Sequence, residues 1–80
     1  MRLPRSLSGE ELARVLSKLG YEITRQSGSH VRLTTKQKGE HHITIPLHKP
    51  LKPGTLNVVL LEIADHFDIT KKELVRFLFE

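Results

Sequence analysis

The stretch YEITRQSGSHVRLTTKQKGEHHITIP, residues 21–46, decides the fold. Within it, apolar and polar residues alternate in three short runs, over approximately residues 21–27, 30–35 and 41–46. Alternation with a period of two is typical of a strand that has one face against a core. The apolar positions are Tyr21, Ile23, Val31, Leu33, Ile43 and Ile45. Because turn residues separate the runs, the stretch predicts three antiparallel strands in a sheet with one apolar and one polar face.

Helices are predicted before and after this sheet. Ser8 and Glu11 have the spacing of a capping box, which indicates that a first helix begins there. Gly20 is placed where a helix often ends in a left-handed cap. A proline-containing loop follows the third strand, and Thr55 is expected to be the N-cap of a second helix that runs to about His66.

A short third helix is predicted from Thr70, because Glu73 completes another capping box. The element order is therefore helix, three-stranded antiparallel sheet, helix and short C-terminal helix. This order predicts an α+β fold with the helices on one face of the sheet. Since 80 residues cannot bury two independent cores, we expect one domain over residues 1–80.

The charge of the chain is uneven. Residues 1–56 hold ten basic and four acidic side chains, whereas residues 57–80 hold three basic and five acidic ones. The basic excess indicates an anionic partner, although a mildly basic domain is also common for solubility alone. The absence of cysteine excludes disulfides and thiolate metal sites. No run approaches the roughly 18 apolar residues of a membrane span, so we expect a cytoplasmic protein.

The polar face of the predicted sheet holds the candidate chemistry. If Val31 faces the core, the pleat places His30 and Arg32 on the other face, beside His42 and Thr44 of the third strand. Histidine is the side chain whose ordinary pKa, about 6.5, lets it accept and donate protons near neutral pH. This face therefore predicts acid–base chemistry next to positive charge.

Three motifs identify the chain as similar to a known family. They are Gly28-Ser29-His30, Ile45-Pro46-Leu47-His48 and Leu51-Lys52-Pro53-Gly54-Thr55-Leu56. In this order and spacing they resemble HicA-type mRNA interferase toxins of the HicAB toxin–antitoxin family (YcfA-like), over nearly the whole chain. The resemblance implies a fold like the double-stranded-RNA-binding domain and endoribonuclease activity against mRNA. It also implies that His30 is essential and that a HicB-type antitoxin covers the site.

A mechanism without metal or other cofactor follows from these residues. Neutral His30 would take the proton from a ribose 2′-hydroxyl, which then attacks the neighbouring phosphorus and expels the 5′-oxygen. Charge on the phosphoryl oxygens would be met by basic side chains and by backbone donors at the start of the second helix. The residues expected to contact RNA are Gly28, Ser29, Arg32, His48, Lys49, Lys52 and Thr55, with Leu56 as a further backbone donor. For His48, a role as the complementary acid, as a phosphate contact or as an ordinary loop residue remains open.

Other functions also fit the sequence. A non-catalytic RNA-binding module would use the same fold, but residues 55–64 contain no lysine or arginine. A protein-interaction domain without a nucleic-acid partner is a further alternative. A zinc site built from His30, His41, His42 and His48 lacks the ligand spacing of such sites, and His41 and His42 are expected to be exposed strand residues. The free chain is expected to be a monomer.

Overall fold

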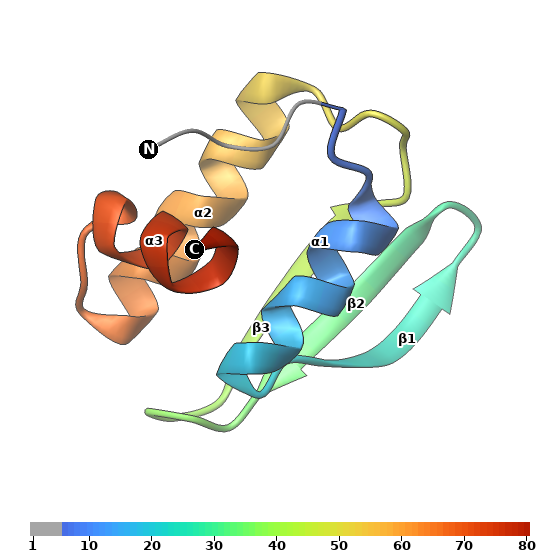
Figure 1. Cartoon of the computed structure of the whole chain (residues 1–80). Helices are drawn as coiled ribbons and strands as arrows, with labels where there is room; N and C mark the ends of the chain where they lie inside the picture. Colours follow the sequence, from blue (N-terminus) through green and yellow to red (C-terminus); the bar gives the residue numbers. More distant parts are fainter. Residues whose placement is uncertain (1–5) are drawn as a thin grey trace.

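The computed structural model describes residues 6–80 as three helical segments packed on one face of a three-stranded antiparallel sheet (Figure 1). The sheet has the strand order β1-β2-β3, so each strand pairs with its neighbour in the chain. The elements are α1 (Gly9–Val15), the 3₁₀ helix η1 (Leu16–Leu19), β1 (Glu22–Ser27), β2 (His30–Thr35), β3 (His41–Pro46), α2 (Pro53–Phe67) and α3 (Lys71–Phe79). The predicted α+β fold is confirmed.

The predicted capping boxes are present at the starts of α1 and α3. Ser8 accepts a hydrogen bond from the backbone of Glu11, and Thr70 does the same for Glu73. In both boxes the glutamate side chain accepts from the backbone of the capping residue. These bonds satisfy donors that a helix start otherwise leaves without a partner, and they lower the pKa of both glutamates.

Two helix boundaries differ from the sequence-based prediction. The first helix tightens into η1 before Gly20, which ends it with a left-handed φ of 80° as predicted. The second helix begins at Pro53, with Lys52 rather than Thr55 as its N-cap. Pro53 occupies the first helical position, where its fixed φ and missing N–H cost nothing. Thr55 therefore lies inside the first turn.

The core lies between the sheet and the helices. Leu33 and Ile45 from the sheet, Leu12 and Leu16 from the first helical segment, and Leu60 from α2 are each at most 1% exposed. Opposite them, the burial of β2 and β3 alternates as the sequence predicts, so the second face of the sheet is polar and open to solvent. No helix within residues 6–80 is long and apolar enough to span a membrane.

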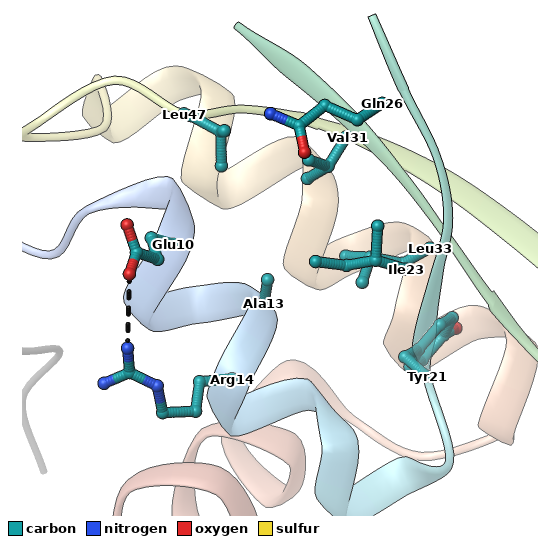
Figure 2. Close-up of a pocket in the computed structure, with 9 residues that line it drawn as sticks. All are labelled: Glu10, Ala13, Arg14, Tyr21, Ile23, Gln26, Val31, Leu33 and Leu47. Carbon is teal, nitrogen blue, oxygen red and sulfur yellow. Dashed lines mark hydrogen bonds and ion pairs between the residues drawn. The ribbon is translucent and has the colours of Figure 1, made fainter.

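Strand β1 departs from the predicted alternation. Tyr21, just before β1, is buried, but Ile23 is 55% exposed, so its prediction as a core residue is wrong. Ile23 still lies opposite Leu33 on the helix-covered face. It lines a pocket of about 490 Å³ between β1 and α1, where Figure 2 shows it across from Ala13. The side chain is exposed because α1 does not cover the edge strand fully.

Candidate functional site

The site begins at the turn between β1 and β2. Gly28 has a φ of 59°, a left-handed conformation that favours glycine. A Cβ at this position would meet no atom within 4 Å, so backbone conformation, rather than crowding within the chain, accounts for the glycine. The exposed residues Gly28 and Ser29 then lead directly into His30, the first residue of β2, whose side chain is also exposed.

The structure joins the first two sequence motifs. His30 lies opposite Pro46 in the β2–β3 ladder, and the backbone N–H of Leu47 donates to the carbonyl of Ser29 at 2.6 Å. This pairing brings the imidazole of His48 to that of His30, with ring centroids 6.4 Å apart and planes inclined by 66°. Both side chains are exposed, so the two rings form an accessible pair at one end of the sheet.

The segment that carries His48 is anchored on α1. The backbone N–H of Gly9 donates to the carbonyl of His48 at 3.0 Å. A Cβ on Gly9 would lie 2.0 Å from the carbonyl oxygen of Pro46, so only glycine permits this approach. The N–H of Leu51 donates to the carbonyl of Leu7 at 2.8 Å and holds the loop a second time. The position of His48 is thus set by the start of the first helix.

Two arginines lie beside His30 on the polar face. The β1–β2 register shifts between Ile23 and Arg25, and this bulge places Arg25 directly opposite Arg32. Both line a hollow of about 400 Å³ whose other lining residues are Ser27, His30, Val31, His42 and Thr44. Two like charges opposite each other in a sheet destabilise the fold, whereas an anion between them would stabilise the arrangement.

Arg25 is a residue of this face that the sequence did not predict. Strict alternation from Tyr21 places Arg25 on the same face as Ile23, against the helices. The bulge adds one residue to β1 and thereby moves Arg25 to the polar face. No glycine or proline in this part of the strand signals the bulge, so it could not be found from the sequence.

The lysines and the start of α2 lie further along the same loop. Lys49 is close enough to Glu11 to contribute to the lowered pKa of that carboxyl, after the hydrogen bonds from Ser8 and the opposing effect of burial. Lys52 is exposed and Thr55 is half-buried. The backbone N–H of Leu56 donates to the carbonyl of Lys52 at 3.0 Å, so the expectation that it is available to an anion is wrong.

A second pair of histidines lies at the opposite end of the sheet. His41 is half-buried, not exposed as predicted, and Nδ1 of its ring shares a 2.7 Å hydrogen bond with the hydroxyl of Tyr21. Its ring stacks on that of His66 at 4.5 Å, and Nε2 of His66 lies 2.9 Å from the carbonyl of Gln37. Burial, and then the nearby His66, lower the pKa of His41, while Glu62 opposes the shift.

The remaining histidine, His42, is exposed as predicted and bonds to Thr34 and Glu40 at 2.7 Å each. Among residues 6–80, hydrogen bonds to protein atoms therefore occupy ring nitrogens of His41, His42 and His66, but not those of His30 and His48. The same residues include no group of three or more His, Cys, Asp or Glu side chains placed to hold a metal ion.

Most of the chain matches one known protein family. Residues 9–65 match the family described as "HicA toxin of bacterial toxin-antitoxin". The chain belongs to the HicA toxin family. The match runs from Gly9, which supports the His48 segment, through both histidine-containing motifs to the last turns of α2, and it ends before α3. Searches of curated proteins and of solved structures give no match.

Membership of the HicA toxin family makes this chain the toxin of a toxin–antitoxin system. An antitoxin partner is a general property of such systems, and mRNA interferase activity is known for the family in general.

Proposed function

We propose that this HicA-family toxin is an endoribonuclease that cuts mRNA without a metal ion, with His30 as the general base. The observation that supports the proposal most is the exposed His30, presented by the Gly28-Ser29 turn beside the opposed side chains of Arg25 and Arg32. A proton acceptor next to concentrated positive charge is what cleavage of a phosphodiester by its own 2′-hydroxyl requires.

The reaction uses one strand of RNA lying across the polar face. His30 removes the proton of a ribose 2′-hydroxyl, and the 2′-oxygen attacks the adjacent phosphorus. The bond from phosphorus to the 5′-oxygen breaks, which gives a 2′,3′-cyclic phosphate and a 5′-hydroxyl end. Arg25 and Arg32 stabilise the negative charge that builds on the phosphoryl oxygens. Because DNA has no 2′-hydroxyl, it is not cut.

The rest of the proposed RNA-contacting surface consists of the turn before His30 and the loop that leads from β3 into α2. Gly28 and Ser29 offer their backbone where the turn meets the RNA, and Lys49, Lys52 and the first turn of α2 at Thr55 extend the positive surface along the loop. These groups bind phosphates and sugars, which position a strand but carry no sequence information.

The antitoxin of HicB type is proposed to inhibit by covering this surface. His30 and the two arginines are exposed, so a partner that carries carboxylates opposite Arg25 and Arg32 would exclude RNA and bury the base at once. On this proposal the free toxin is a monomer, because no second copy is needed to complete the site.

The test is cleavage of a defined single-stranded mRNA by the wild-type protein and by His30→Ala, in the presence of a metal chelator, with both ends of each product mapped. We expect cyclic phosphate ends from the wild type and a loss of about 10² to 10⁴ in rate for the variant. Lys72→Ala, exposed on α3 outside the proposed surface, is the matched control and should cut like the wild type.

Two outcomes would contradict the proposal. Cleavage that the chelator abolishes would indicate a metal-dependent reaction. RNA binding without cleavage, weakened steeply by salt, would instead indicate the non-catalytic RNA-binding module.

A further inference from the structure

We infer that His48 is the general acid that protonates the leaving 5′-oxygen, so that two histidines share the proton transfers of the proposed cleavage. The inference rests on the proposed function and adds a second catalytic residue to it. It comes from the placement of the two imidazoles, whose centroids are 6.4 Å apart although the residues are separated by 17 others in the chain.

The spacing brings both rings close enough to face one phosphodiester. In an in-line displacement the attacking and leaving oxygens lie on opposite sides of one phosphorus, and each needs a group within about 2.6–3.2 Å to exchange a proton. Rings in stacking contact would leave no space for a phosphate, as with His41 and His66 at 4.5 Å. The rings of His30 and His48 instead meet edge to face, with centroids 6.4 Å apart, so they do not cover each other's faces and both stand exposed to an incoming phosphodiester.

The backbone holds His48 where this role requires it. The Leu47 N–H bonds to the carbonyl of Ser29 from one side, and the Gly9 N–H bonds to the carbonyl of His48 from the other. The carbonyl of Pro46 sits against Gly9 where any other residue would collide. Contacts at three consecutive residues fix the backbone from which the His48 side chain extends, and they keep that side chain at the His30 end of the sheet.

The ring nitrogens of both histidines are free to act. Within residues 6–80, neither ring is engaged in a hydrogen bond to protein, in contrast to the other three histidines. A histidine with a structural role uses its nitrogens within the fold, as His41 does with Tyr21.

The two histidines exchange one proton each during the cleavage. Neutral His30 accepts the proton of the 2′-hydroxyl as the 2′-oxygen bonds to phosphorus, and protonated His48 gives its proton to the 5′-oxygen as the bond from phosphorus to that oxygen breaks. The products are a 2′,3′-cyclic phosphate and a 5′-hydroxyl. The enzyme is left with His30 protonated and His48 neutral, and exchange with water restores both.

A substrate with sulfur in place of the 5′-oxygen separates this role from all others, because a thiolate leaves without a proton. The substrate is a short RNA around a cleavage site mapped for the wild type, made with either oxygen or sulfur at the scissile position. We expect His48→Ala to cut the oxygen substrate about 10² to 10⁴ times more slowly than the wild type, and the sulfur substrate at nearly the wild-type rate. His30→Ala should fail on both, since the attacking hydroxyl still has to lose its proton.

Every other result contradicts the inference, and each one indicates a different role for His48. Equal loss on both substrates would make His48 a binding or positioning residue, and no loss on either would make it an ordinary loop residue. Failure of the wild type to cut any RNA would instead remove the proposed function itself. Because the His48 side chain is exposed, thermal unfolding of His48→Ala should match that of the wild type, and Lys72→Ala serves as the activity control.

Discussion

The two ends of the sheet each hold a pair of histidine rings, and the pairs differ in what their nitrogens do. His41 and His66 stack at 4.5 Å and bond to Tyr21 and to the carbonyl of Gln37. His30 and His48 lie 6.4 Å apart, exposed, and the fold binds neither ring. The same residue type thus closes the structure at one end and faces solvent at the other. Hydrogen-bond occupancy, rather than proximity alone, distinguishes the structural pair from the pair for which we propose a catalytic role.

The largest expected effect comes from removing one ring at each end. His30→Ala should lower the cleavage rate by about 10² to 10⁴ and leave the melting temperature unchanged. His41→Ala should do the reverse, because it leaves the Tyr21 hydroxyl without its partner, which costs about 1–3 kcal/mol. RNA cleavage per folded molecule and thermal unfolding, measured on both variants, check this. If His41→Ala lost activity while folded, the comparison would fail.

Gly9→Ala should destabilise the protein by roughly 1–3 kcal/mol, because the added methyl group would overlap the carbonyl of Pro46. The segment bearing His48 would have to shift, so cleavage should fall as well. Gly54→Ala is the matched control: its Cβ would meet nothing within 4 Å, and alanine in a helix should stabilise by about 0.5–1 kcal/mol. Urea unfolding of both variants measures the difference, and equal stabilities would show that the close approach has no energetic consequence.

Tyr21→Phe should cost about 1 kcal/mol, since it removes the hydroxyl that bonds to His41 but keeps the buried ring. A double-mutant cycle with His41→Ala isolates the energy of the hydrogen bond between the two side chains. Once His41 is absent, the further cost of Tyr21→Phe should be close to zero or favourable, because the hydroxyl then has no ring to bond. Additive losses in urea unfolding would indicate that the hydroxyl and the imidazole act independently.

Acid should weaken the His41 end of the sheet. The groups that face His41 are Tyr21, His42, Glu62 and His66, and the pKa of His41 in the folded protein lies below its ordinary value of 6.5. His41 therefore binds a proton more readily in the unfolded chain than in the folded protein. Its contribution to the free energy of unfolding is complete above about pH 6.5 and is lost as the pH falls below that value.

Unfolding by urea at pH 7.5 and at pH 5 tests this loss. His66→Gln removes one of the two stacked rings and should reduce the difference between the two pH values. His48→Gln, at the other end of the sheet, should leave that difference unchanged. A larger difference in His66→Gln than in the wild type would be inconsistent with repulsion between the rings.

The smallest effect is expected at the opposed arginines. Arg25→Gln should raise stability by about 0.2–1 kcal/mol, because it relieves the repulsion from Arg32. The same change should weaken RNA binding and lower the slope of log affinity against log salt by about 0.7 per lost phosphate contact. Urea unfolding and binding titrations at several salt concentrations give both values. Weaker binding with an unchanged salt slope would argue against a phosphate contact.

The sequence predicted the local elements well. The three strands, the capping boxes at Ser8 and Thr70 and the left-handed Gly20 all agree with the structure. Each of these features depends on residues within a few positions of one another, so periodicity and capping chemistry are enough to find it. The polar face of β2, with His30 and Arg32, follows from the same local alternation.

The parts that the sequence did not determine depend on contacts across the fold. The bulge in β1 turned Arg25 to the polar face and left Ile23 exposed, and nothing in the alternation of that strand indicated it. The stacking of His41 on His66 joins the start of β3 to the end of α2, which no spacing in the chain predicts.

By itself, then, the sequence determined which elements form and which face of the sheet carries His30, because both depend on short-range patterning. Only the tertiary structure decided which groups stand beside His30. The β2–β3 ladder and the approach of Gly9 to Pro46 bring His48 to it, and the register of β1 brings Arg25. The physical reason is that a site is assembled by strand pairing and close backbone contacts between distant segments, and these depend on how the whole chain packs.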